Sequence, residues 1–307
     1  CETFGCTHAI AVNSATSGLL AACNAIGVTN EEVIVSPYTM SATAAAPAFL
    51  GADLRFVDIE PNYYCLDPKM IALNIAETGK VKAIIATNLF GHPSELKLLA
   101  QLAHASGAYL IEDNAQSPFA VEDGAFAGTI GDIGVFSLNV HKALQCGEGG
   151  IIVTDNDEFA HSMRMFLNHG EVAGGPIGLN LRMTEVSAAI ACAPLSRGRE
   201  IIQDRINQAE KIIDVFSGHA DLLPPTIRGD CSHSFYCIAF RAPWQLRDII
   251  VKQMNDEGVP LRAGYLSPLY ALPAFAEYAA ECPITEGVER EIILWENCGW
   301  SPTDSQI

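Results

Sequence analysis

Short apolar runs alternate with longer helical patterns along the first half of the chain. Six runs rich in Val, Ile and Phe predict strands over residues 31–36, 53–59, 81–91, 108–115, 134–138 and 149–155. The segments between the early runs predict helices over residues 16–27, 40–50, 67–77 and 94–106. Strands that are apolar at nearly every position are covered on both faces, which is typical of a mostly parallel α/β sheet with helices on both faces. A site is expected at the carboxyl ends of such strands.

After residue 183 the pattern changes to a long helical stretch that reaches about residue 217. Pro194 interrupts it, and its missing N–H and its ring predict a kink or break there. A strand, a helix and a loop rich in proline and glycine then follow, over residues 234–240, 245–257 and 258–275. We therefore expect a large α/β domain, residues 1–195, and a smaller α+β C-terminal domain, residues 196–307.

The composition narrows the classes of partner. The chain has 307 residues, enough for one large domain and a smaller companion. Its 36 acidic and 18 basic residues give a formal net charge of −18, which repels nucleic acid and anionic membranes. No apolar run approaches the ~18–20 residues that span a bilayer, and no charged-then-apolar leader opens the sequence. We expect a cytoplasmic protein that binds neither nucleic acid nor membrane.

The ten cysteines are scattered, without a C-x-x-C pair or a zinc-finger spacing, and the eight histidines are equally dispersed. In a chain of this size such cysteines are expected to be reduced and to pack as small apolar residues. The sequence therefore predicts no metal site.

Two motifs place polar side chains where strands meet helices. "AVNSATSGLL" (11–20) puts small and hydroxyl residues at a helix entry, where they can cap the helix or, together with free amides, cradle a phosphate. "LIEDNAQS" (110–117) ends an apolar strand with Glu112, Asp113 and Gln116. A carboxylate there can cap a helix, bind a metal or pair with a protonated ring nitrogen. Because no second carboxylate cluster is evident, the metal is the least favoured of these.

"FSLNVHKALQCGEGG" (136–150) places Lys142 five residues after Ser137 and five before Gly147, between two apolar strands. A solvated surface lysine is the plain interpretation. A lysine beside a buried site, however, loses its proton more readily and attacks a carbonyl to form a Schiff base. With an anion cradle and a strand-end aspartate in the same sheet, the natural carbonyl is the aldehyde of pyridoxal 5′-phosphate.

Four ordered motifs together resemble one family. They are "HAIAVNSATSGL", "IEDNAQS", the lysine segment and "GLNLRMTEVSAAI" (178–190), and "NHG" (168–170) adds to them. In these segments the chain resembles the DegT/StrS family of sugar aminotransferases, within the fold-type-I pyridoxal-phosphate superfamily. The resemblance covers nearly the whole chain and implies a fold-type-I large domain.

The resemblance implies a role for each matching residue. Lys142 would form the internal aldimine and shuttle the substrate proton, Asp113 would pair with the pyridinium nitrogen, and Gln116 would reach the ring hydroxyl. The phosphate would be held by Thr16, Ser17 and Ser137. Asn180 is expected to reach the phosphate of the neighbouring subunit's cofactor, so the resemblance implies a homodimer with shared active sites.

The chain departs from the family pattern at two positions near the expected cofactor. Met40 stands where an aromatic residue usually stacks on the ring, with Tyr38 two residues earlier. A thioether can lie against the ring there. Ala15 replaces the glycine of the family's N-S-G-T-S, so it must tolerate the backbone shape that the glycine provides.

Three functions stay open on the sequence. The first is an aminotransferase that moves an amino group from glutamate or glutamine to a keto sugar, usually nucleotide-linked, or to a keto-cyclitol. The second is a pyridoxal-phosphate deoxysugar dehydratase, in which histidine replaces the lysine; His141 is adjacent, but the spacing selects Lys142. The third is a non-catalytic sensor with the same fold. The acceptor would be selected by loops 170–178 and 260–275, where Arg262, Tyr265 and Tyr270 are candidate contacts.

Overall fold

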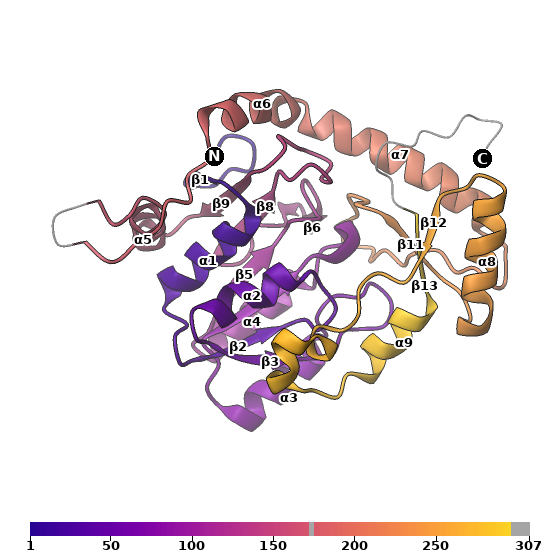
Figure 1. Ribbon diagram of the computed structural model, residues 1–307, viewed down its shortest axis with the longest axis horizontal. Coiled ribbons are helices and arrows are strands. Elements are labelled where there is room, and N and C mark those ends of the chain that lie inside the picture. Colours follow the sequence, from indigo (N-terminus) through magenta and orange to yellow (C-terminus); the bar gives the residue numbers. More distant parts are fainter. Residues whose placement is uncertain (172–174, 296–307) are drawn as a thin grey trace.

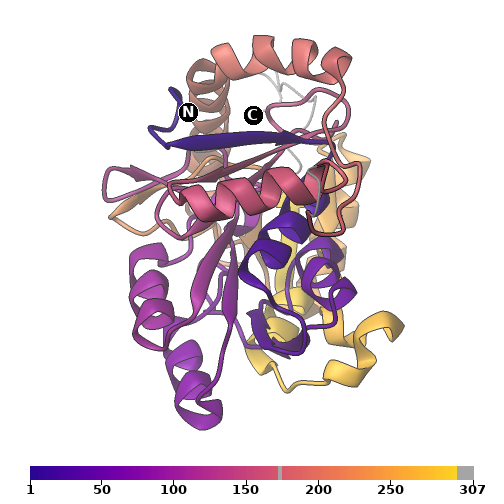
Figure 2. The same cartoon turned by 90° about the vertical axis from the view of Figure 1, so that its left-hand side faces the viewer.

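The computed structural model describes residues 1–171 and 175–295, which form a twisted seven-stranded sheet with helices on both faces and smaller sheets beside it (Figure 1). From one edge to the other the strands are β1 (His8–Val12), β9 (Gly150–Thr154), β8 (Ile133–Ser137), β5 (Tyr109–Asp113), β4 (Ala83–Thr87), β2 (Glu32–Val35) and β3 (Asp53–Phe56). Seen from the side, the indigo strand β1 lies across the central strands, as the right-handed twist requires (Figure 2).

The sheet is mostly parallel, which confirms the predicted fold class. Neighbours from β3 to β8 run parallel, whereas β9 is antiparallel to both β8 and β1. The reversal follows from the connection, since residues 138–149 join β8 to β9 without the crossover helix that returns a parallel strand. The sequence pattern did not predict strand β1. The predicted strand 81–91 is too long, because β4 ends at Thr87 and Phe90 has φ 58° in the 3₁₀ turn η1 (Leu89–Gly91).

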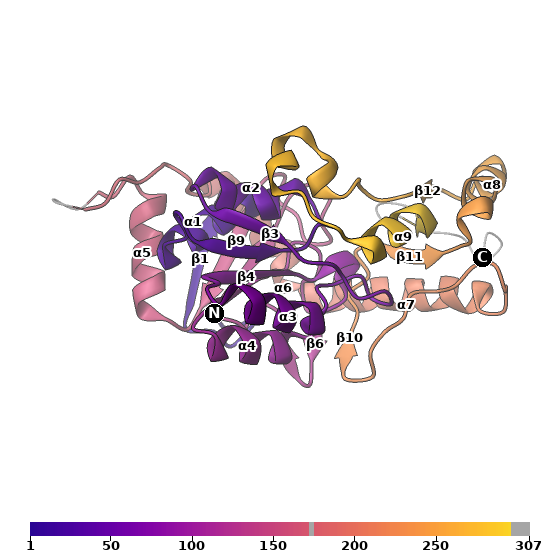
Figure 3. The same cartoon turned by 90° about the horizontal axis from the view of Figure 1, so that it is seen from below.

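Helices cover the two faces of the sheet in separate groups. One face carries α1 (Ala15–Ile26), α2 (Ser41–Phe49) and α5 (Asp157–Leu167), and the other carries α3 (Pro68–Thr78) and α4 (Leu96–Ala105). Figure 3 shows α2 above the sheet and α3 and α4 below it. Strand alternation explains the division, because Val33 and Val35 join the core under α1 whereas Ile34 joins the core under α4.

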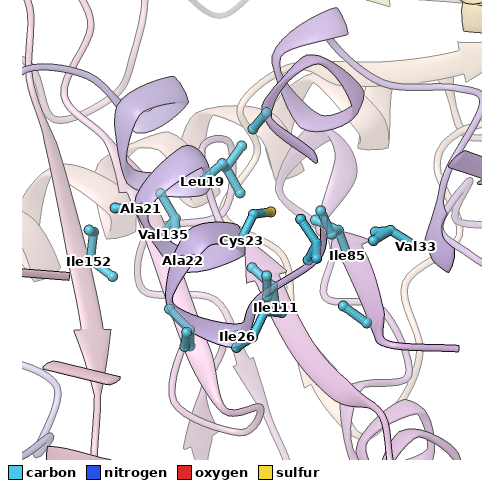
Figure 4. Close-up of a cluster of buried hydrophobic side chains, with 14 of the residues drawn as sticks. Leu19, Ala21, Ala22, Cys23, Ile26, Val33, Ile85, Ile111, Val135 and Ile152 are labelled. Carbon is cyan, nitrogen blue, oxygen red and sulfur yellow. The ribbon is translucent and has the colours of Figure 1, made fainter. Parts of the chain in front are cut away.

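The α1 face holds the core drawn in Figure 4. Leu19, Cys23 and Ile26 of α1 face the sheet, where they meet Ile85, Ile111, Val135 and Ile152 from four successive strands. Gly18 allows the closest approach, since a Cβ there would lie 2.8 Å from Cγ1 of Val135. This packing fixes where the amino end of α1 lies over the strand ends.

The second half of the chain builds a small antiparallel sheet in the order β11 (Ile238–Arg241), β13 (Ile292–Trp295), β12 (Leu261–Ala263). One face packs on α7 (Gly198–Phe216) and on α8 (Trp244–Asp256). The other face packs on the large sheet's loops, where Cys237 and Ala239 contact Tyr38 and Phe90. The small sheet thereby closes one wall of the site.

The remaining elements complete the second half. They are α6 (Glu185–Ser196), α9 (Pro283–Glu291), the 3₁₀ turns η2 (Leu269–Ala271) and η3 (Pro273–Tyr278), and a ribbon of β10 (Cys231–Ser232), β6 (Val121–Glu122) and β7 (Ala125–Phe126). In the described residues, no helix is both long enough and apolar enough to cross a membrane.

Several predictions for this half need correction. The break expected at Pro194 lies at Arg197, whose φ of −104° and ψ of 11° separate α6 from α7, while Pro194 stays inside α6. The loop expected over 258–275 contains β12, a three-residue strand that forms through its partner β13 and not through its own pattern. The predicted helix near 245–257 is confirmed as α8. The division into domains 1–195 and 196–307 stays a prediction.

Candidate active site

The strand register brings the predicted site segments to one edge of the large sheet. Val12 pairs with Gly150, and Gly150 pairs with Ser137 in the next strand. Asp113 pairs with Val135, two residues before Ser137. The start of α1, the start of the lysine loop and the strand-end aspartate therefore lie together, as expected for the carboxyl ends of such a sheet.

The amino end of α1 is built as a close junction with β9. Ser14 caps the helix by accepting a hydrogen bond from the Ser17 amide at 3.1 Å. A Cβ on Gly150 would lie 2.7 Å from the Ala15 nitrogen, so glycine is needed for β9 to approach the helix this closely. Ala15 is the first residue of α1, and its replacement of the family glycine is compatible with this helical start. First-turn amides have no partner within a helix and favour an anion.

Lys142 lies in the loop between β8 and β9, and Asn139 organises that loop. The Asn139 side chain accepts from the His141 amide at 3.1 Å and donates to Glu148 at 2.8 Å. Its backbone carbonyl accepts from the Lys142 amide at 2.9 Å. These bonds hold the turn that presents Lys142, whose Nζ lies 4.5 Å from the centre of the Tyr236 ring.

Asp113 is a buried carboxylate at the end of β5. Thr43 in the first turn of α2 donates to its Oδ2 at 2.7 Å, and the Ala115 amide donates to its Oδ1 at 3.1 Å. Burial raises the pKa of Asp113 above its usual range, while Thr43, Ala115 and the charge of Lys142 oppose that rise. A cationic group in the cavity would favour the ionised carboxylate further.

Glu112, the neighbouring carboxylate, lies on the opposite side of the strand. It accepts from the amides of Gly128, Ile130 and Gly131 at 2.5–2.8 Å and is fully buried. Burial raises the pKa of Glu112 to about 7, against the lowering effect of these three amides. Because successive side chains of a strand point to opposite faces, Glu112 fixes a loop while Asp113 faces the site.

A cavity of about 540 Å³ joins these parts. Five of the predicted site residues line it: Thr16, Met40, Asp113, Ser137 and Lys142. Met40 is the N-cap of α2 and 47% exposed, which is high for a methionine. Tyr38 instead lies fully buried, with its ring edge-on to that of Tyr265 in the cavity wall. Met40, and not Tyr38, therefore lines the cavity, and its contact with a cofactor ring stays a prediction.

Three predicted residues do not belong to the described residues that line this cavity. Ser17 lies in the first turn of α1 with its hydroxyl 3.0 Å from that of Ser14. Gln116 is buried behind the wall, accepting from the Phe90 amide at 2.7 Å and donating to the Tyr265 hydroxyl at 2.8 Å. Asn180 is exposed and accepts from Nε of Arg182 at 3.1 Å. Their roles toward a cofactor stay predictions.

Of the three residues expected to contact the acceptor, two lie at the cavity and one lies elsewhere. Arg262 and Tyr265 line the cavity, and Arg262 donates to the Tyr265 carbonyl at 3.1 Å. Tyr270 lies elsewhere, with its ring near Phe56 and its hydroxyl donating to Glu286 at 3.3 Å. Part of loop 170–178, residues 172–174, lies outside the described residues.

Sequence reasoning missed Thr43, Asn139 and Tyr236 as site residues. Thr43 could have been predicted from the sequence, because it lies three positions after Met40 at a helix start. Two residues at this spacing lie on the same face of a helix. Tyr236 comes from the distant small sheet, and no local pattern connects it to Lys142. Among the described residues, no group of three or more His, Cys, Asp or Glu side chains could hold a metal ion.

Comparison with known proteins identifies the family. Residues 1–296 match the model of the DegT/DnrJ/EryC1/StrS aminotransferase family. The chain belongs to this family. The match confirms the resemblance carried by the sequence motifs and makes the chain a member of an aminotransferase family.

Individual proteins are also similar to this chain over nearly its whole length. The dTDP-3-amino-3,4,6-trideoxy-alpha-D-glucose transaminase of Micromonospora megalomicea subsp. nigra is 31% identical over 305 residues, which are 94% of this chain and 79% of that protein. A UDP-N-acetyl-3-dehydro-alpha-D-glucosamine 3-aminotransferase of Acidithiobacillus ferrooxidans is 30% identical over 295 residues, with the same two coverages. The solved structure of S. venezuelae DesV in complex with a ketimine intermediate has a TM-score of 0.93 at 26% identity, covering 99% of this chain and 83% of that one.

Aminotransferases of the DegT family depend on pyridoxal phosphate, and the cavity fits that group. It offers an amine, a buried carboxylate and a helix amino end next to a serine hydroxyl. These match the aldehyde, the ring nitrogen and the phosphate, in that order. The junction at Gly150, which a Cβ would obstruct, keeps the helix end beside Ser137.

Proposed function

We propose that this chain is a pyridoxal-phosphate-dependent aminotransferase that takes an amino group from glutamate or glutamine. The acceptor is a keto sugar, most often nucleotide-linked, or a keto-cyclitol. The observation that carries the proposal is one cavity lined by Lys142, Asp113 and the start of α1. Each provides what one part of the cofactor needs, and they come from three separate segments of the chain.

Each residue that lines the cavity is assigned a role from its chemistry. When bound, pyridoxal phosphate supplies an aldehyde and an electron-accepting ring. The α1 amides, Thr16 and Ser137 would hold its phosphate, while Met40 would lie against the ring. Asp113 would keep a proton on the ring nitrogen, and Nζ of Lys142 would take the proton from the substrate carbon and return it. The expected contact of Gln116 with the ring hydroxyl stays a prediction, because its amide nitrogen donates to the Tyr265 hydroxyl behind the cavity wall.

The acceptor class is inferred from the relatives and the cavity together. Both relatives described above are named for nucleotide-linked sugars, and a cavity of about 540 Å³ is of the size that holds a small organic ligand. Arg262 lies on the cavity wall, where its guanidinium suits a phosphate or carboxylate. Nine cysteines of the described residues are free, which fits a cytoplasmic enzyme.

A homodimer is part of the proposal. Helix α6 is mostly apolar, yet Ala191 is its one buried residue. Val186 and Ile190 lie on the same helix face and are 72% and 52% exposed. The segment leading into α6 carries Leu179, 41% exposed, beside Asn180. An apolar face next to the residue expected to reach a neighbour's phosphate favours a two-fold interface there.

Charges on that face are expected to separate the subunits. Replacing both Val186 and Ile190 by glutamate places two carboxylates in the proposed interface, so sedimentation should show mostly monomer and cofactor binding should weaken by tenfold or more. The matched control is Leu73→Glu, because Leu73 is 65% exposed on α3 and away from this face. A double variant that remains as dimeric as the control would contradict the interface.

The cofactor assignment has a direct chemical test. The protein purified with pyridoxal phosphate should show a visible absorption band that borohydride abolishes, with the reduced cofactor's mass appearing on the peptide that contains Lys142. The Lys142→Ala variant should carry no such mass. Labelling of any other lysine in the wild-type protein would refute the assignment.

A further inference from the structure

Tyr236 contacts the side chain of Lys142 at the cavity. Nζ of Lys142 lies 4.5 Å from the centre of the Tyr236 ring, and both residues line the cavity. A lysine ammonium within about 6 Å of an aromatic face is attracted by the ring quadrupole. Lys82 makes the same kind of contact with Tyr109 at a longer distance, 5.5 Å, outside the site.

The ring belongs to a firmly held stretch of backbone. The Tyr236 amide donates to the Phe90 carbonyl at 2.8 Å, and the Tyr236 carbonyl accepts from Arg205 of α7 at 2.9 Å. One bond ties the residue to the large sheet's η1 turn and the other ties it to the long helix. The ring therefore presents its face from a fixed position, whereas the lysine stem has several rotatable bonds.

We infer that Tyr236 is a positioning residue for Lys142, holding its ammonium form against the cavity wall so that the amine acts from one place. The functional meaning rests on the proposed role of Lys142 as the proton carrier. The contact itself is independent of the cofactor, since it joins two side chains of the chain.

Other charged and titratable groups share the cavity and must be kept constant in a test. Asp113 faces it from β5, His141 and Glu148 from the lysine loop, Arg262 from β12, and Cys237 and Tyr265 from the segments next to β11 and β12. The charge of Lys142 lowers the pKa of Asp113, so the two side chains attract each other. A change confined to the ring's electron distribution isolates the contribution of Tyr236.

The experiment measures the reactivity of the Lys142 amine in the full chain freed of small molecules. Trace acetic anhydride acetylates neutral amines, and peptide mass spectrometry gives the pH midpoint for each lysine. Tyr236→Phe should retain the wild-type midpoint for Lys142. Monofluoro- and trifluorophenylalanine keep the shape but weaken the ring quadrupole, so they should lower the midpoint stepwise, by between about 0.4 and 1.5 pH units in total. Tyr236→Leu should lower it as well.

Two internal references make the result decisive. The midpoint of Lys82 should stay constant through the Tyr236 series, and Tyr109→Leu should leave the midpoint of Lys142 unchanged. A flat fluorine series, or an equal shift for Lys142 in Tyr109→Leu, would overturn the inference. Because the fluorinated side chains are nearly isosteric, the outcome does not depend on whether Tyr236→Leu folds. A failure of the cofactor test at Lys142 would leave this measurement unaffected.

Discussion

Replacing Lys142 by alanine is expected to slow amino-group transfer by orders of magnitude while the cofactor still binds. The variant loses the group that would take and return the substrate proton, and a positioned acid or base of this kind contributes about 10²- to 10⁴-fold in rate. It retains the amino end of α1, Ser137 and Asp113 around the cavity. Equilibrium dialysis with pyridoxal phosphate and single-turnover measurements with glutamate would test the two halves of this prediction separately.

Matched variants distinguish the proton transfer by Lys142 from the effect of its positive charge. Lys142→Arg keeps a cation in the loop but cannot give up its proton, so it should be as inactive as the alanine variant. Lys97→Ala removes an exposed lysine paired with Asp123 and should leave the rate unchanged. His141→Ala tests the alternative dehydratase chemistry, since the exposed His141 also lines the cavity. Undiminished transfer by Lys142→Ala would refute the role proposed for it.

The central sheet was predictable because its signal is local. The apolar runs predicted β2, β5, β8 and β9 to within one or two residues, and their continuously apolar sequence predicted a mostly parallel sheet. The reversed direction of β9 and the presence of β1 depend on which strands pair. Pairing is a long-range property that a short run of residues does not specify.

The candidate site also has a part that local sequence predicts and a part that depends on long-range packing. Lys142, Ser137 and Asp113 lie in motifs at strand ends, and the sheet register brings them to one edge. Strand alternation predicts that Glu112 and Asp113 face opposite ways, but the register was needed to show which one faces the cavity. Tyr236 comes from the second sheet, so its contact with Lys142 depends on how the two sheets pack. Asn180 would act on a neighbouring subunit, which one chain does not contain.

Replacing Asp113 by asparagine is expected to slow the enzyme while leaving the cofactor attached. Asparagine is nearly isosteric and can still accept a hydrogen bond from Thr43, but it withdraws the negative charge that would keep the ring nitrogen protonated. At ~3 Å and an effective dielectric constant near 20, that charge contributes about 5 kcal/mol toward the protonated ring. Losing half of this corresponds to a rate loss of roughly fifty- to a hundredfold, since each 1.36 kcal/mol is a factor of ten. Single-turnover rates with glutamate would measure it.

The Asp113 and Lys142 variants should therefore differ in kind. Borohydride should still fix the cofactor on the Lys142 peptide of Asp113→Asn, whereas Lys142→Ala offers no amine there. Thr43→Val should slow the reaction less than Asp113→Asn, because it removes one hydrogen bond and leaves the carboxylate. The surface control is Asp123→Asn, which changes an exposed carboxylate away from the cavity. A half-reaction of Asp113→Asn as fast as that of Asp123→Asn would mean that the buried carboxylate only organises the end of β5 through Thr43 and Ala115.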